Sequence, residues 1–215
     1  MTSKTSFTIS FALVAAMLVI GAALWGRLPD PIPAHWNAAG EIDGYMPKFW
    51  GVFLMPIITA VLLPLFMVIP HIDPLKANIA QFRGVYNLFI VFFTAYMVYI
   101  YGLTVAAALG YEFNMTYMLL PVVGLLFIGA GYLMKKARRN FFVGIRTPWT
   151  LSNVEVWDKT HQLGSKLFVA GGVVTILSTF LGEYGIWVML PAMLIAAFVP
   201  IIYSYILFAR IEKSG

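Results

Sequence analysis

Cysteine is absent from this chain of 215 residues, and charged residues make up only 11% of it. Without cysteine the protein can form no disulfide, carry out no thiol redox chemistry and bind no metal through thiolates. A soluble domain is about one quarter charged. The low charge, together with a hydrophobic content of 61%, therefore excludes an ordinary soluble fold and predicts a helical membrane protein with several spans.

Crossing a bilayer takes about 20 helical residues. Five apolar runs are close to or above this length, and a sixth, residues 167–181, is short unless residues 163–166 dip into the interface. We predict an all-α, polytopic membrane protein with six transmembrane helices, over residues 7–25, 49–69, 85–109, 117–134, 167–181 and 185–209. The first run is longer than the apolar part of a signal peptide, and we expect it to be retained. Gly124, Gly129 and Gly131 in the fourth run would allow a neighbouring helix to approach closely.

Lysine and arginine are distributed unevenly between the loops. With the N-terminus in the cytoplasm, only Arg27 and Lys48 of the 14 basic residues fall outside. Because basic residues mark the cytoplasmic side of membrane proteins, we predict that both termini are cytoplasmic and that the protein is a multi-pass protein of the cell membrane. The same bias explains the net charge of +5, and we expect no direct contact with nucleic acid.

Ionisable residues other than tyrosine are missing from the middle of every predicted span. An acidic or basic side chain inside the membrane is the usual sign of a proton or ion pathway. This absence counts against a secondary transporter or a pump, and it leaves a lipid-handling role open.

The longest polar stretch, residues 135–166, carries seven of the 14 basic residues. Ser152 and Glu155 have the spacing of a capping box. This spacing predicts a short helix over residues 153–162, which Gly164 would end. We expect Trp149 and Trp157 to lie at the level of the lipid headgroups.

The loop between the first two runs contains prolines at positions 29, 31 and 33 and turn residues after them, which predicts an extended segment followed by turns. His35, Glu41 and Asp43 have side chains that suit zinc. No paired-histidine motif exists in the chain, so we expect no metal and no cofactor. We expect His35 and Trp36 to form a hydrogen-bonded turn instead.

Arg146, Asp158 and His161 invite an acid–base interpretation. A nucleophile is missing, because no serine lies in a Gly-x-Ser-x-Gly setting and the nearby threonines have no evident base. We therefore predict no catalytic residues. In this interpretation Arg146 binds lipid phosphate or helix-end carbonyls, and His161 forms hydrogen bonds within the fold.

Residues 140–164, here called the signature segment, resemble the signature loop of the SdpI family of bacterial and archaeal membrane proteins. The likeness rests on Asn140, Gly144, Ile145, Arg146, Thr147, Pro148, Trp149, Thr150, Leu151, Trp157, Thr160, His161 and Gly164. The pattern L-P-x-x-I-P-x-H-W-N-x-x-G-x-x-D-G-Y-x-x-K at residues 28–48 is similar to the N-terminal membrane domain of unknown function that often accompanies this family. We predict an N-terminal membrane domain over residues 1–84 and an SdpI-like domain over residues 85–215.

The resemblance implies an immunity protein, not an enzyme, that protects against a secreted, membrane-active peptide toxin. It also implies a signalling receptor that holds a transcriptional repressor at the membrane when toxin is bound. The residues expected to face the toxin are His35, Trp36, Asn37, Asp43, Gly44 and Tyr45. The cytoplasmic signature residues are Asn140, Gly144, Arg146, Thr147, Pro148, Trp149, Trp157 and His161.

Two alternatives stay open. A protein that binds or transports a lipid or another amphiphile would use a cavity between the glycine-rich fourth span and the proline-broken second and sixth spans. A membrane-embedded enzyme would use His35 or His161 as its base. In the favoured interpretation, the fourth and fifth spans couple the outer loop to the signature segment.

Overall fold

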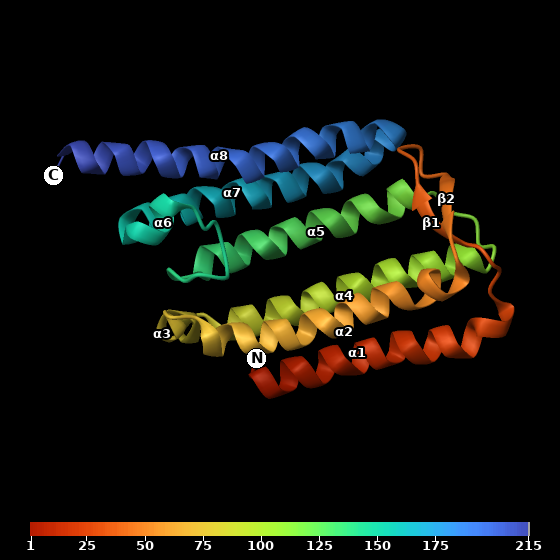
Figure 1. Cartoon of the computed structure of the whole chain (residues 1–215). Helices are drawn as coiled ribbons and strands as arrows, with labels where there is room; N and C mark the ends of the chain where they lie inside the picture. Colours follow the sequence, from red (N-terminus) through yellow and green to blue (C-terminus); the bar gives the residue numbers. More distant parts are fainter. Residues whose placement is uncertain (215) are drawn as a thin grey trace.

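A computed structural model describes residues 1–214 of the chain. Long helices run side by side in two groups (Figure 1). The first group contains α1 (Ser3–Leu24), α2 (Lys48–Ile72) and α4 (Arg83–Ala108), and the second contains α5 (Met115–Lys136), α7 (Val154–Ser178) and α8 (Gly185–Ser214). The short helices are η1 (Trp25–Arg27), α3 (Lys76–Gln81), α6 (Pro148–Ser152) and η2 (Thr179–Tyr184).

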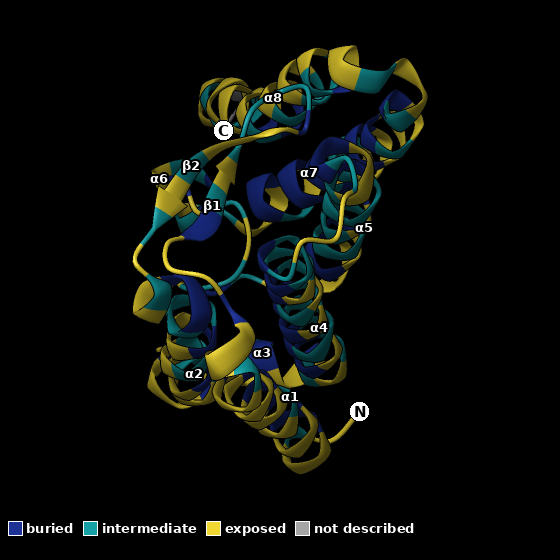
Figure 2. Ribbon diagram, turned by 90° about the vertical axis from the view of Figure 1, so that its right-hand side faces the viewer, coloured by how far each residue is buried: buried dark blue, intermediate teal, exposed yellow. Residues whose placement is uncertain are grey.

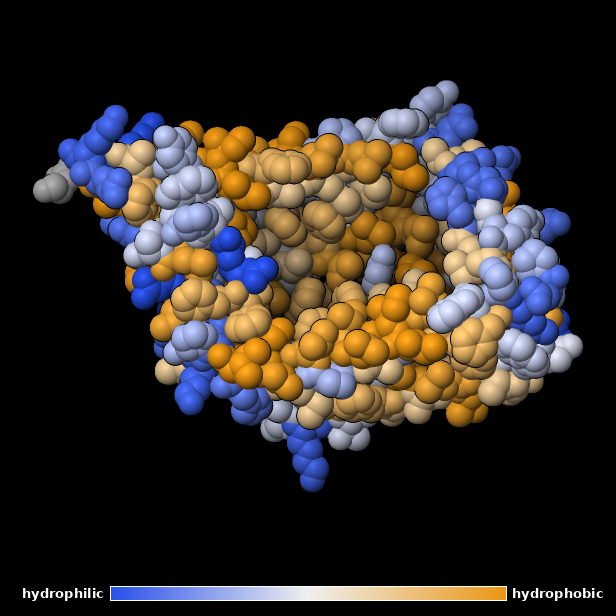
Figure 3. All heavy atoms as spheres, in the orientation of Figure 1, coloured by the Kyte–Doolittle hydropathy of each residue, from blue (hydrophilic) through white to orange (hydrophobic). Residues whose placement is uncertain are grey.

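Five stretches are long and apolar enough to cross a membrane. They are Ser3–Arg27, Lys48–Ile72, Arg83–Ala108, Met115–Lys136 and the 60-residue stretch Val154–Lys213, which runs through α7, η2 and α8. Exposed residues lie on the outward faces of the helices (Figure 2), and a broad apolar band separates two polar ends (Figure 3). Such a surface needs lipid around it, and the prediction of a multi-pass membrane protein is confirmed.

Close contact between α5 and α7 depends on glycine. A Cβ atom added at Gly124 would lie 2.5 Å from the carbonyl oxygen of Gly172. At Gly129 it would lie 2.7 Å from the ring of Phe92 on α4, and at Gly131 it would lie 3.0 Å from the carbonyl oxygen of Ser165. The predicted close approach at these three glycines is confirmed. It fits the packing of membrane helices, in which small residues let backbones meet.

The expectation of a wholly helical chain is wrong at one place. Strands β1 (Ile32–Trp36) and β2 (Ile42–Met46) form an antiparallel hairpin between α1 and α2. Three hydrogen bonds fasten this hairpin to the start of α5. Asn114 Nδ2 donates to the carbonyl oxygen of Ala39 at 2.6 Å, and Thr116 Oγ1 donates to that of Ala38 at 3.1 Å. The amide of Met115 donates to the carbonyl oxygen of Gly40 at 3.3 Å. The hairpin thereby contacts the second helix group.

The predicted short helix ending at Gly164 is also wrong. Residues 154–178 form one helix, α7, and its N-cap is Asn153, whose side chain accepts hydrogen bonds from the amides of Glu155 and Val156. Ser152 instead ends α6. Gly164 lies inside this helix and makes room for Ile145, whose Cδ1 lies 2.5 Å from the position that a Cβ atom at residue 164 would take.

Proline does not break the helices that contain it. α2 continues through Pro56, Pro64 and Pro70, and α8 continues through Pro191 and Pro200. Neighbouring helices and hydroxyl side chains can satisfy the freed backbone groups of a membrane helix. The second and sixth spans are therefore continuous helices and not broken ones.

Candidate functional site

The signature segment folds around the fully buried side chain of Asn140. Its Nδ2 donates to the carbonyl oxygens of Arg138 and Val143 at 2.8 and 3.0 Å. Its Oδ1 accepts from the amides of Phe142 and Val143 at 2.9 and 2.6 Å. An asparagine amide has two donor hydrogens and two acceptor lone pairs. All four are used, so Asn140 shapes the loop and offers nothing to a ligand.

His161 is equally committed to the fold. Its Nε2 accepts a hydrogen bond from the amide of Ile145 at 3.0 Å, and its Nδ1 donates to the carbonyl oxygen of Trp157 at 2.8 Å. This pattern requires the neutral ring with hydrogen on Nδ1. The ring also stacks on Trp157, with centroids 3.9 Å apart. Neither nitrogen of His161 is available as a catalytic base.

Gly144 permits this arrangement. Its φ of +111° lies in a region that L side chains rarely adopt, and a Cβ atom there would overlap Nε2 of His161. Glycine is therefore required twice at this position, for the backbone conformation and for the close approach of the imidazole.

Thr147 and Thr150 form the capping box of α6. Thr147 Oγ1 accepts from the amide of Thr150 at 3.2 Å, Thr150 Oγ1 accepts from the amide of Thr147 at 3.0 Å, and Pro148 occupies the start of the helix. Thr147 Oγ1 also lies 3.0 Å from Ser204 Oγ on α8. The turn is thus fastened to the last helix.

The two tryptophans differ in environment. Trp149 packs against Tyr205 of α8, with ring centroids 5.1 Å apart. Trp157 is fully buried, and its Nε1 donates to the carbonyl oxygen of Ala137 at 3.1 Å. The expectation that Trp157 lies at the lipid headgroups is therefore wrong, because its ring fills the space between the loop and α7.

Arg146 is exposed, and its Nη1 donates to the carbonyl oxygen of Phe141 at 2.9 Å. Within residues 1–214 no hydrogen bond or ion pair joins Arg146, Asp158 and His161. The structure therefore does not assemble the acid–base group that the sequence suggested.

Two residues outside the signature segment hold it in place. The carboxylate of Asp73 is 2% exposed and accepts from the amides of Leu75 and Phe141 at 2.6 and 2.8 Å. Asn78 on α3 donates to the carbonyl oxygen of Arg139 at 2.7 Å. Sequence reasoning missed both residues. The Asp-Pro pair at residues 73–74 signals a turn, but no sequence pattern shows its distant partner.

The hairpin brings the other predicted residues together. His35 Nδ1 lies 2.5 Å from Asp43 Oδ1 across the two strands, and both side chains are exposed. Gly44 pairs with His35, and a Cβ atom at Gly44 would lie 2.9 Å from that of His35. The expectation of a turn at His35 is therefore wrong. His35 lies in strand β1, and Asp43 in strand β2 is the partner of its side chain.

Asn37 and Tyr45 complete this face. The amide of Asn37 donates to the carbonyl oxygen of Glu41 at 2.9 Å, and the Asn37 side chain contacts the Glu41 carboxylate at 3.1 Å. Tyr45 is 61% exposed.

Beside the hairpin lies a pocket of about 500 Å³, lined by Trp36, Gly40, Glu41, Ile42, Ala107, Gly110, Tyr111, Glu112, Phe113 and Asn114. In the described part of the chain, no three histidine or acidic side chains are grouped closely enough to hold a metal ion.

The two candidate sites lie at opposite ends of the helices (Figure 1). α5 and α7 run between them and pack closely along their length. The geometry therefore defines an exposed hairpin surface at one end of the helices. At the other end it defines the hydrogen-bonded signature segment, here also called the cap.

Two family models match separate parts of the chain. Residues 136–204 match the model of the SdpI/YfhL protein family, and residues 12–60 match a domain of unknown function, DUF1648. Over residues 136–204 the chain is therefore similar to the SdpI/YfhL protein family, as the residues of the signature segment indicated. The domain boundary between residues 84 and 85 stays a prediction.

A relative with a named role is the Immunity protein SdpI of Bacillus subtilis (strain 168). The chain is 29% identical to it over 208 residues, which cover 96% of this chain and 97% of the relative. No solved structure matches the chain.

Proposed function

We propose that this protein is a membrane immunity protein that protects a cell against a secreted, membrane-active peptide toxin. The observation that carries the proposal is the similarity to an immunity protein over nearly the full length of both chains. The relative's name describes protection and not catalysis, and a non-enzymatic role for this chain is part of the proposal.

The proposed topology has six spans with both termini in the cytoplasm. α7 and α8 lie side by side and are joined by η2, where Gly182 has a φ of +62°. A 60-residue apolar stretch that turns back in this way can cross the membrane twice. The excess of basic residues near the signature segment supports a cytoplasmic position for that end.

The proposed toxin-facing surface is the hairpin, with His35, Trp36, Asn37, Asp43, Gly44 and Tyr45. Its exposed aromatic and ionisable side chains suit contact with an amphipathic peptide at the membrane surface. Asn114 and Thr116 at the start of α5 donate hydrogen bonds to the carbonyl oxygens of Ala39 and Ala38 in the hairpin turn, so a change in the position of the hairpin would act directly on α5.

A repressor would meet only the exposed part of the signature segment. Buried Asn140, Thr147, Trp157 and His161 cannot contact a partner without unfolding the cap. Arg146 and Pro148 are exposed, and we propose that this outer surface holds the repressor while toxin is bound.

Expression in a toxin-sensitive bacterium tests the immunity role. Cells with the wild-type chain should survive the purified toxin, and cells with equal membrane levels of Asp43→Asn should not. Equal survival of wild-type and vector-only cells would contradict immunity itself. Survival of Asp43→Asn cells would contradict only the role of the hairpin.

The receptor role has a separate readout, which is toxin-dependent transcription of a reporter under the repressor's promoter. Arg146→Ala should abolish the response to toxin while survival stays unchanged. A full response in Arg146→Ala cells would contradict docking at this surface.

A further inference from the structure

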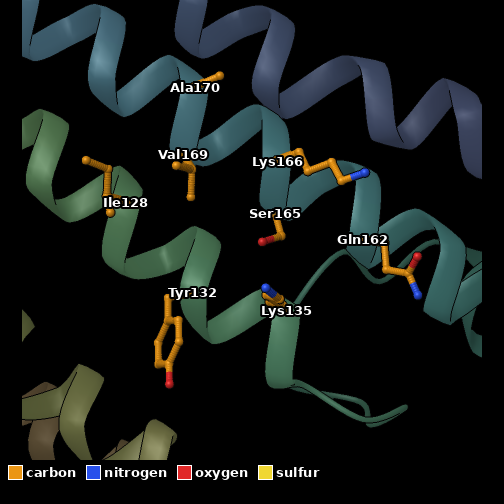
Figure 4. Close-up of a pocket in the computed structure, with 8 residues that line it drawn as sticks. All are labelled: Ile128, Tyr132, Lys135, Gln162, Ser165, Lys166, Val169 and Ala170. Atoms are coloured by element: carbon orange, nitrogen blue, oxygen red, sulfur yellow. The ribbon is translucent and has the colours of Figure 1, made fainter.

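A groove of about 700 Å³ lies between α5 and α7 near the signature segment (Figure 4). It is lined by Ile128, Tyr132, Lys135, Gln162, Ser165, Lys166, Val169 and Ala170. The two lysines and Gln162 lie toward one end, and Ile128, Val169 and Ala170 lie toward the other. The groove is therefore amphipathic along its length.

A second groove borders the apolar end of the first and shares two of its lining residues. Ile128 and Tyr132 also line a space of about 430 Å³ between α4 and α5. Its other lining residues are Val85, Leu88, Phe89, Phe92, Leu125 and Gly129, all apolar. A hydrocarbon chain that begins beside α7 can thus pass Tyr132 and continue along α4.

The two lysine side chains at the polar end of the groove are available to bind a ligand. In the part of the chain that the structure describes, the side chains of Lys135 and Lys166 form no hydrogen bond or ion pair. Lys159, two turns of α7 before Lys166, is instead paired with Glu155 at 2.6 Å. Two free ammonium groups beside a hydrocarbon groove are complementary to an anionic headgroup that carries an acyl chain.

We propose that these joined grooves bind one anionic phospholipid from the leaflet next to the signature segment. Lys135 and Lys166 hold its phosphate, and Gln162 lies at the same polar end. One acyl chain lies against Ile128 and Val169 and extends into the α4–α5 groove. A lipid in this position would contact both helix groups. The proposal does not depend on the immunity function.

Lipid titration of the delipidated full-length protein in neutral detergent, followed by native mass spectrometry, tests the site. Phosphatidylglycerol should bind at least about tenfold more tightly than phosphatidylcholine with the same acyl chains. The double variant Lys135→Gln/Lys166→Gln should lose roughly ten- to thirtyfold in affinity for phosphatidylglycerol, because each basic residue near an anionic surface contributes about fivefold.

The matched control is Lys76→Gln/Lys213→Gln, which removes the same charge from exposed positions outside the groove. It should bind phosphatidylglycerol as the wild type does. Equal losses in the two double variants, or equal binding of the two lipids by the wild type, would overturn the proposal.

A second variant tests the apolar part while keeping both lysines. Val169→Trp fills the groove and should weaken phosphatidylglycerol binding about tenfold, with the melting temperature in detergent used to verify folding. Glycerol phosphate, which has the headgroup charge without acyl chains, should not compete with the lipid at equal concentration. Full competition, or unchanged lipid binding in Val169→Trp, would point to a site for free phosphate and refute the lipid site.

Discussion

Asp73 accepts a hydrogen bond from the backbone amide of Phe141, 2.8 Å away and 68 residues further along the chain. The same carboxylate accepts from the amide of Leu75 just after α2. One buried acid therefore ends a helix of the first group and holds the signature segment of the second. Hydrogen bonds from this acid and from Asn78 therefore link the two helix groups at this end, in addition to apolar packing.

Replacing Asp73 with alanine should loosen this end of the molecule. Two buried amides lose their acceptor, and hydrogen bonds to a charged group contribute about 1.5–3 kcal/mol each. We expect the free energy of unfolding to fall by about 3–6 kcal/mol, as measured by denaturant titration in micelles. Hydrogen exchange at Phe141 should become faster. Asp158→Ala, at the same end of the bundle, is the control and should leave that exchange rate unchanged.

Gly144→Ala should destabilise the signature segment through backbone strain and through a clash with His161. The variant Gly110→Ala separates these two effects. Gly110 also has a positive φ, +87°, but a Cβ atom there meets nothing within 4 Å. Gly110→Ala should therefore cost only the backbone strain of about 1–2 kcal/mol. Gly144→Ala should cost at least about 1 kcal/mol more, because it also breaks the bond between His161 and Ile145. Equal melting temperatures of the two variants would mean that the imidazole contact is unimportant.

Gly172→Val should push α7 away from α5. Its Cβ position lies 2.5 Å from the carbonyl oxygen of Gly124, and overpacking typically costs about 1–3 kcal/mol. The control is Gly102→Val on α4, where no atom lies within 4 Å of the added carbon. Thermal melting in detergent should show a clear loss for Gly172→Val and little change for Gly102→Val. The reverse order would argue against the observed helix pairing.

The contact between His35 and Asp43 should matter little for stability. Exposed ion pairs contribute about 0.2–1 kcal/mol, and these side chains are 73% and 42% exposed. We expect His35→Gln and Asp43→Asn to melt within a few degrees of the wild type and yet to lose protection against toxin. Loss of both properties together would assign the pair a structural role, and retention of both would remove it from the proposed toxin surface.

The absence of cysteine makes the proposed topology simple to test, because any introduced thiol is the only one in the chain. Tyr111→Cys, at a residue 68% exposed near the hairpin, should react with a membrane-impermeant maleimide added to intact cells. Ala77→Cys, exposed on α3 at the other end, should react only after the cells are opened. The opposite labelling pattern would invert the orientation.

The membrane class and most helix positions were predictable because they depend on local composition. α1, α2, α4 and α5 each begin and end within a few residues of the predicted spans. Gly124, Gly129 and Gly131 were recognisable as contact positions because small residues have one main use in a membrane helix. Gly164 was misinterpreted as a helix end, since the sequence alone does not distinguish a terminating glycine from one that makes room for Ile145.

By itself, the sequence determined that this chain lies in a membrane as a set of apolar helices and that its signature segment has the residue pattern of the SdpI family. Only the tertiary structure decided what those residues do, because their roles depend on partners that are distant in the chain. Asp73 finds the amide of Phe141, Thr147 finds Ser204, and His35 meets Asp43 across a hairpin. Hydropathy and spacing describe each segment alone, whereas these hydrogen bonds arise from how the helices pack together.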